Sequence, residues 1–193
     1  MKKIKRFIIN IRPSYFKRLL AGSKNMSREE VIACIDDNRK LISPCTIYES
    51  FSIGDLKDGK LKDAIRKAVP ENTEINLYSV VSLLMVTVGD AIDKKLSAPG
   101  GTGDSPQVME ALGNEALEQS VSFVYKLIEK DAVEEDCVAG LPVRTDGYCA
   151  REISEMLDAG RIGIKSNDDF SIYPSRSAAA FCLWAPLKKK KRK

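Results

Sequence analysis

The segment "VVSLLMVTV", residues 80–88, is the longest apolar run in the chain. It is too short to cross a bilayer as a helix, which takes about 20 apolar residues. Its valines and its threonine favour an extended backbone, because branching at Cβ suits a pleated strand better than a helix. The wider segment 74–90 is therefore predicted to be a buried strand.

The clearest helix signal follows that strand, from residue 105 to about residue 130. Asp104 or Ser105 can cap the helix, and Pro106 suits its first turn. An apolar stripe recurs at helical spacing: Val108, Leu112, Ala116, Leu117, Val121, Val124 and Ile128. We interpret this stripe as the face that packs on the core.

The remaining elements are shorter. Ser27 and Glu30 form the pattern of a capping box at the start of a helix. Further helices are expected at 56–69, 90–97 and 150–160, and strands at 6–11, 46–53 and 137–143. Three short pieces close the chain, "RIGI", "FSIYP" and "SAAAFCLWA", of which the last two are expected to be neighbouring strands or a hairpin turning at Pro174–Ser175. Helices and strands alternate without a βαβ rhythm, so the sequence predicts an α+β fold with a largely antiparallel sheet.

The length of 193 residues suits one domain with a hydrophobic core. We expect a single domain over 1–187, beginning with a basic arm over 1–25, and a disordered basic tail over 188–193. The tail carries six positive charges, which exceeds the net charge of +4, so residues 1–187 have a net charge of −2. The basic body that is typical of nucleic-acid-binding proteins is missing, and we expect no nucleic-acid partner. We also expect no membrane partner, because no apolar run is long enough to span a bilayer. The N-terminus lacks the pattern of a secretory signal, so we expect a cytoplasmic location.

The chain contains no histidine. This excludes histidine-based catalytic triads and histidine-ligated zinc, and it removes the most common general acid and base. The five cysteines form no CxxC pair and are interpreted as reduced thiols. Neither a catalytic residue nor a metal ligand is therefore assigned.

The stretch "LPVRTDGYCA", residues 141–150, contains Arg144, Asp146, Gly147 and Tyr148 in what reads as a tight turn. An arginine there can pair with a nearby carboxylate such as Asp146 or Glu152. Alternatively, its planar fork can bind the carboxylate of a ligand. The residues alone leave both interpretations open.

A series of landmarks resembles the activation domain of cobalamin-dependent methionine synthase. In order, they are "VTVGDAIDKKL" (86–96), "MEALGNEALEQ" (109–119), the Arg144–Tyr148 turn, "RIGI" (161–164) and "NDDFSIYPSRSAAAFCLW" (167–184). Together they span about residues 74–185. The resemblance implies a crescent-shaped α+β domain that binds S-adenosylmethionine and docks over a cobalamin domain. In that family, an electron from flavodoxin reduces inactive cob(II)alamin, and S-adenosylmethionine then methylates it.

Within this resemblance, Arg144, Gly147 and Tyr148 are the candidate residues for binding S-adenosylmethionine, joined by Asp168, Asp169 and Tyr173 near the same surface. The chain departs from the family in two ways. Its arginine lies three residues before the Gly-Tyr pair instead of four, and Asp146 replaces a proline. The implied function is that of an accessory protein acting in trans on a corrinoid-dependent methyltransferase, with a flavodoxin-like electron donor and with cobalamin supplied by the partner. The alternative is a non-enzymatic module that binds a corrinoid protein and has lost S-adenosylmethionine.

Overall fold

The computed structural model describes residues 1–20, 26–69, 78–98 and 106–187. Its main sheet has the strand order β1-β2-β3-β8-β4, and β5 pairs with β8 beside β4. These strands are β1 (Lys2–Lys5), β2 (Cys45–Ser52), β3 (Val80–Thr87), β4 (Cys137–Ala139), β5 (Val143–Thr145) and β8 (Ser177–Pro186). Every pairing is antiparallel. The α+β class with a largely antiparallel sheet is thus confirmed.

Strand β3 lies at the centre of the sheet and pairs with β2 and β8 over its whole length. Residues 81–87 are all buried, because helices cover both faces of the sheet. Alternate side chains of β3 enter separate cores: Leu84 and Val86 face one, and Leu83 and Met85 face the other. The prediction of a buried strand is confirmed, and this strand divides the interior in two.

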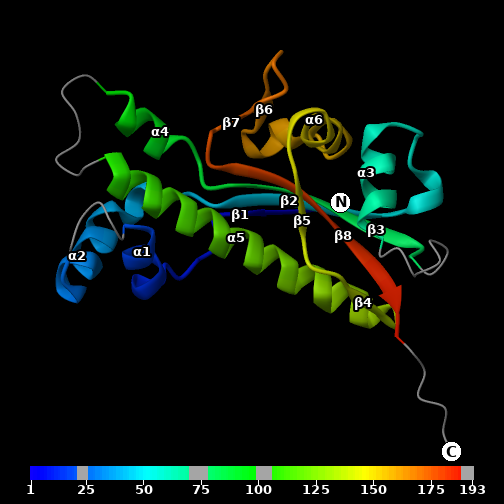
Figure 1. Cartoon of the computed structure of the whole chain (residues 1–193), viewed down its shortest axis with the longest axis horizontal. Coiled ribbons are helices and arrows are strands. Elements are labelled where there is room, and N and C mark those ends of the chain that lie inside the picture. The colour runs from blue at the N-terminus through cyan, green and yellow to red at the C-terminus, as the bar shows by residue number, and fades with distance from the viewer. Residues whose placement is uncertain (21–25, 70–77, 99–105, 188–193) are drawn as a thin grey trace, which may run out of the picture.

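The long helix α5 (Pro106–Glu134) covers the first face of the sheet, together with α1 (Pro13–Leu19) and α2 (Arg28–Asn38) (Figure 1). The short helix α4 (Ala91–Leu96) packs beside α5. On the opposite face lie α3 (Lys60–Ala68), α6 (Gly147–Met156) and the 3-10 turn η4 (Ala159–Ile162). Two further 3-10 turns, η1 (Arg39–Leu41) and η2 (Ile53–Asp55), flank β2. Within the described part of the chain, no helix is long and apolar enough to cross a membrane.

The N-terminal arm is held against α5 by a buried carboxylate. Glu115 is fully buried on α5 and accepts hydrogen bonds from Nε of Arg12 at 2.8 Å and from Nη2 of Arg12 at 3.2 Å. The backbone N–H of Arg12 also donates to Glu115, at 3.2 Å, and Gln119 donates to it at 3.0 Å. The ring of Phe7 stacks on Phe123 of α5, with the ring centres 4.3 Å apart. Residues 1–20 are therefore a packed part of the domain.

Most expected helices form where they were predicted. Ser27 and Glu30 make both hydrogen bonds of the capping box, and α4 and α5 closely match their predicted ranges. Helix α3 begins only at Lys60, because the chain first makes the turn η2 and then passes through Gly59 in an extended conformation. Helix α6 begins at Gly147, three residues before its predicted start.

Several strand predictions are wrong. The first strand is β1, which ends where Arg6 adopts a φ of +56°, so residues 6–11 run beyond it. The segment 137–143 divides into β4 and the start of β5. "RIGI", for which no element type was predicted, contains the end of η4 and a left-handed Gly163, with a φ of +83°. The predicted hairpin is also absent from the described residues, because β7 (Ile172–Tyr173) pairs with β6 (Lys165–Ser166) rather than with β8.

Candidate functional site

The segment around Arg144 is the junction between a strand and a helix. Strand β5 pairs with the middle of β8, so that Arg144 lies opposite Ala180 and Thr145 lies opposite Ala179. Asp146 occupies the N-cap position of α6, and Gly147 is the first residue of that helix. Because side chains alternate along a strand, Arg144 points toward the α5 side of the sheet and Thr145 toward the α6 side.

A cavity of about 210 Å³ opens at this junction. Its walls come from β5, the first turns of α6, the turn before β7 and the start of β8. We call it the β5–α6 cavity, and its lining is Arg144, Thr145, Asp146, Gly147, Ala150, Phe170, Ser171, Ile172, Ser177, Ala178 and Ala179. The fold thus brings Arg144 and Gly147 together with residues that lie about 30 positions further along the chain.

Two hydroxyl groups in this cavity have no hydrogen-bond partner. Oγ1 of Thr145 and Oγ of Ser177 are buried, and neither finds a donor or acceptor within the residues that the structure describes. A buried hydroxyl left unpaired costs about 1–3 kcal/mol, so such atoms are uncommon in folded proteins. Both side chains line the same hollow. A polar ligand bound there could satisfy them.

The first turn of α6 also faces this cavity. Over the described chain, the side chain of its N-cap residue Asp146 makes no capping hydrogen bond. The free N–H groups and the dipole at the start of a helix favour a negatively charged group. Gly147 has a φ of +52°, and a Cβ added there would meet no atom within 4 Å. The backbone at Gly147 is therefore open to close approach by a ligand.

Arg144 is already paired in this structure. Its Nη2 lies 2.8 Å from Oε1 of Glu118 on α5, and the two side chains are 42% and 46% exposed. Asp146 and Glu152, which the sequence suggested as partners, are not the residues that bind it: Glu152 instead accepts a hydrogen bond from the backbone N–H of Leu61 at 2.8 Å. Because the pair is half exposed, it contributes little to stability, and a ligand carboxylate could replace Glu118 at modest cost.

Tyr148 lies outside the cavity, at its rim. Its ring packs on Phe170, which lines the cavity, with the ring centres 5.3 Å apart. Nζ of Lys60 lies 4.4 Å from the centre of the Tyr148 ring, and the guanidinium of Arg151 lies 5.6 Å from the Phe170 ring. The two rings form a partly exposed aromatic surface beside the opening.

The other three predicted site residues are spread around the β6–β7 turn. Asp169 accepts hydrogen bonds from both the hydroxyl and the backbone N–H of Ser171, and these bonds lower the pKa of its carboxyl. Asp168 lies near Arg151, whose pKa is raised first by its hydrogen bond to Glu155 and also by the charge of Asp168. Tyr173 is not among the residues that line the β5–α6 cavity, whereas its neighbour Ile172 is. The structure thus brings two of the six predicted residues into one cavity, with Tyr148 and Asp169 one contact away.

Sequence reasoning did not single out Thr145, Phe170 or Ser177 as site residues. Thr145 and Phe170 lie within the motifs of the resemblance, but other residues of those motifs were assigned to the site. Ser177 is a small residue at the start of a strand, and nothing local distinguishes it. Only the pairing of β5 with β8 places its hydroxyl near that of Thr145.

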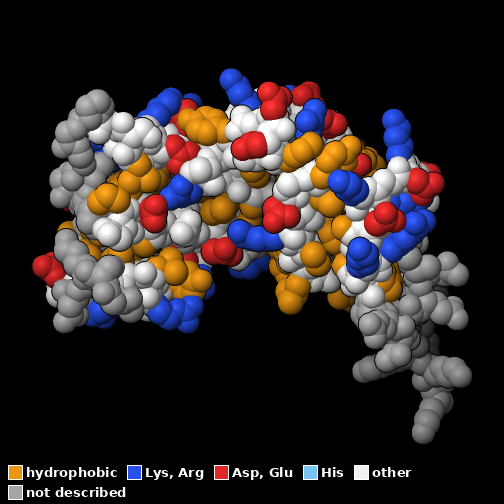
Figure 2. Space-filling view, turned by 45° about the horizontal axis from the view of Figure 1, so that its top comes forward, with side chains coloured by type: hydrophobic (Ala, Val, Ile, Leu, Met, Phe, Trp, Pro, Cys, Tyr) orange, Lys and Arg blue, Asp and Glu red, His pale blue; other side chains and the backbone are white. Residues whose placement is uncertain are grey.

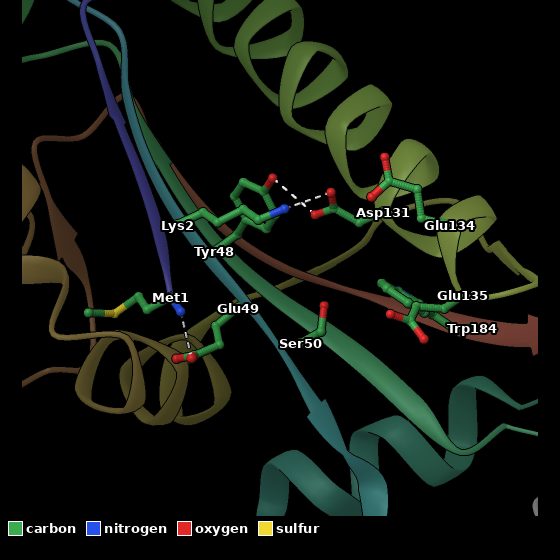
Figure 3. Close-up of a pocket in the computed structure, with 9 residues that line it drawn as sticks. All are labelled: Met1, Lys2, Tyr48, Glu49, Ser50, Asp131, Glu134, Glu135 and Trp184. Atoms are coloured by element: carbon green, nitrogen blue, oxygen red, sulfur yellow. Dashed lines mark hydrogen bonds and ion pairs between the residues drawn. The ribbon is translucent and has the colours of Figure 1, made fainter.

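A second cavity, of about 280 Å³, lies between β1, β2 and the end of α5 (Figure 3). Nζ of Lys2 lies 2.7 Å from Asp131, which also accepts a hydrogen bond from the Tyr48 hydroxyl at 3.2 Å, and the Met1 amino group lies 2.7 Å from Glu49. Glu134 and Glu135 add further negative charge at its edge. Among the described residues, no cluster of His, Cys, Asp or Glu could hold a metal ion. This acidic hollow is therefore not a candidate metal site.

No protein-family model matches this chain, and a search of curated proteins finds no match. A search of solved structures finds the crystal structure of the MetH reactivation domain bound to AdoHcy. The two chains are 13% identical and superpose with a TM-score of 0.58, over 98% of this chain and 79% of the other. At this identity, the similarity shows the fold alone. This protein therefore has the fold of the MetH reactivation domain, which is the fold predicted from its sequence landmarks.

Proposed function

We propose that this protein acts in trans as an accessory of a cobalamin-dependent methyltransferase and binds S-adenosylmethionine in the β5–α6 cavity. The observation that carries the proposal is the pair of unpartnered hydroxyls of Thr145 and Ser177 inside that cavity. They occur in a fold whose solved relative binds AdoHcy. A ligand of this class carries the polar groups that such hydroxyls require.

The residues that line the cavity suit the amino-acid end of S-adenosylmethionine better than its adenosine end. The start of α6 offers positive character for an α-carboxylate. Arg144 also lines the cavity, and its guanidinium would have to leave Glu118 on the α5 side to add to this character. The volume of about 210 Å³ is below the 300–1,000 Å³ of typical small-molecule sites. We therefore assign the amino-acid end of the ligand to the cavity. We assign the adenosine end to the partly exposed rings of Tyr148 and Phe170, where a flat aromatic face can pack on a purine.

The proposed role of this chain is to hold S-adenosylmethionine in position for methyl transfer. When bound, S-adenosylmethionine supplies the methyl group, and the partner protein supplies the cobalamin that accepts it. Transfer of a methyl group from a sulfonium needs no protein acid or base, so a chain without histidine is suited to the task. Holding two reactants in line can contribute about 7–11 kcal/mol to lowering a barrier. A flavodoxin-like donor is the proposed source of the electron.

The proposal can be tested by reconstitution. A corrinoid methyltransferase that lacks its own activation domain is mixed with this protein, a reductant and S-adenosylmethionine, and the visible spectrum of the cobalamin is followed. We expect methylcobalamin to accumulate only when this protein is present. Equal accumulation without the protein would rule out the accessory role.

A second candidate is a module that binds a corrinoid protein without any small ligand. The ion pair between Arg144 and Glu118 favours it, because the one arginine at the cavity is already engaged. Under this candidate, co-purification with a corrinoid protein would be unchanged in Arg144→Ala, and calorimetry would detect no binding of S-adenosylmethionine at millimolar concentration.

A further inference from the structure

The N-terminal arm presents an isoleucine to solvent. Ile8 is 91% exposed, the most exposed large hydrophobic side chain among the described residues. Its position is fixed, because its neighbours alternate: Phe7, Ile9 and Ile11 pack toward the core, so Ile8 must point outward. Ile8 is thus exposed because its neighbours in the arm pack inward.

A shallow apolar hollow of about 250 Å³ lies beside Ile8. Its lining includes Phe7, Ile9 and Ile42, and the one charged side chain in the lining is Arg39. Pro44 also lines it, and the carbonyl of Pro44 accepts a hydrogen bond from the backbone N–H of Arg6 at 2.9 Å. An apolar surface with cationic residues at its border therefore runs from the arm to η1.

The positive charge at this border is not neutralised within the described residues. Lys3, Lys5, Arg6, Arg39 and Lys40 form no ion pair there. The pKa of Lys3 is lowered, first by desolvation and then by the nearby charges of Lys5 and Arg161. The second of these causes, the nearby positive charges, is expected where cations gather without counter-charges.

Asp90 lines a hollow together with Lys40 but is already paired with Lys94 at 2.7 Å. The acidic residues nearest to this border along the chain are Asp36 and Asp37, at the end of α2. Residues 1–20 contain seven Lys or Arg and no acidic residue. The two carboxylates therefore leave a clear excess of positive charge around the hollow, which we call the arm surface: Lys3, Lys5, Arg6, Phe7, Ile8, Arg39 and Lys40.

We propose that the arm surface binds the face of an anionic phospholipid membrane, without spanning it. A membrane interface takes up a single projecting apolar side chain together with flanking cations, which attract the anionic headgroups. Nucleic acid would use the cations but not Ile8, and the one aromatic ring of the arm surface, Phe7, is already stacked on Phe123 instead of being open to a base. The apolar part is also small compared with the apolar centre of a standard protein interface.

Such binding would leave the candidate site accessible. The arm surface borders β1, which is one edge of the main sheet, whereas the β5–α6 cavity lies beside β8 and β5 at the other edge. In the space-filling view, charged side chains of both signs are scattered over the face that is shown (Figure 2). The expectation of no membrane partner rested on the lack of a long apolar run, which bears on spanning a bilayer but not on lying against it.

The test is sedimentation of the full chain with vesicles, either of phosphatidylcholine alone or with about 30% phosphatidylserine. We expect binding to the anionic vesicles only, and weaker binding as salt is raised. The variant Arg6→Glu/Arg39→Glu should bind at least about 25-fold more weakly, since each cation contributes about fivefold. Ile8→Ser should bind severalfold more weakly, while the control Lys57→Glu/Lys126→Glu should match the unmodified protein.

The basic tail is present in every variant, so its own attraction to anionic vesicles is common to all of them. Far-ultraviolet circular dichroism verifies that each variant is folded. The proposal is overturned if the unmodified protein does not bind anionic vesicles at physiological salt. It is equally overturned if Arg6→Glu/Arg39→Glu binds as tightly as the control, because the binding would then belong to another part of the chain.

Discussion

Arg12 and Glu115 form an ion pair, and we expect replacement of Arg12 to destabilise the protein more than replacement of Glu115. Glu115 is fully buried, whereas the side chain of Arg12 is 49% exposed. In Arg12→Ala, the carboxylate stays buried and keeps only the amide of Gln119 as a side-chain donor among the described residues. A buried charge left without its partner costs about 3–5 kcal/mol. In Glu115→Gln, by contrast, the shape of the side chain is retained and Arg12 can turn to water, so about 1–2 kcal/mol is lost.

Urea denaturation followed by the fluorescence of Trp184, the only tryptophan, measures both variants. A loss of 3 kcal/mol corresponds to a melting temperature lower by about 6–12 °C for a chain of this size. The sharpest comparison is the double variant Arg12→Ala/Glu115→Gln, which carries no buried charge at this position. We expect it to be more stable than Arg12→Ala alone. If the second substitution lowers stability further, or if Glu115→Gln is the more damaging single change, then the carboxylate is not held by Arg12 in the way described.

The other predictions concern the candidate site and the buried titratable groups. Thr145→Val and Ser177→Ala should leave the stability of the free protein unchanged or slightly raised, because each removes an unpaired hydroxyl; a loss above about 1 kcal/mol in urea denaturation would show that these hydroxyls have partners. Gly147→Ala should lose about 1–2 kcal/mol through backbone strain alone, because its φ is +52° and its Cβ would meet open space; an unchanged urea midpoint would contradict this. Burial raises the pKa of the Cys182 thiol to about 12 and of the Tyr125 hydroxyl to about 12. These groups ionise at lower pH when unfolded, so their contribution to stability should be constant below about pH 9 and fall from pH 9 to pH 12; a smaller fall in Cys182→Ala, measured by urea titration at several pH values, checks the assignment.

The sequence predicted the parts of the fold that depend on local pattern. The buried strand β3, the capping box at Ser27 and the long helix α5 follow from residue type and spacing, which neighbours in the chain decide. The first strand was predicted at residues 6–11 but lies at Lys2–Lys5. A strand of four residues depends on its partner β2 more than on its own composition. The pairing of β7 with β6 likewise depends on contacts that no local pattern specifies.

The candidate site was predicted only in part for the same reason. Arg144 and Gly147 could be found because they belong to one short motif. The partner of Arg144 is Glu118, 26 residues earlier, which only the packing of α5 against the sheet brings near. Ser177 reaches the cavity through the register of β8 with β5. A site assembled from separate strands leaves little trace in any single stretch of sequence.

Isothermal titration calorimetry with AdoHcy tests the central claim, that the β5–α6 cavity takes an S-adenosyl ligand. The unmodified protein should bind with measurable heat at one site. Binding should weaken at least about fivefold in the double variant Thr145→Val/Ser177→Ala, which removes two hydrogen bonds worth about 0.5–1.5 kcal/mol each. The matched control Lys130→Ala, which breaks an exposed pair with Glu134 at the end of α5 and away from the cavity, should bind like the unmodified protein. No heat at millimolar AdoHcy, or equal affinity in the double variant, would contradict the assignment of this cavity.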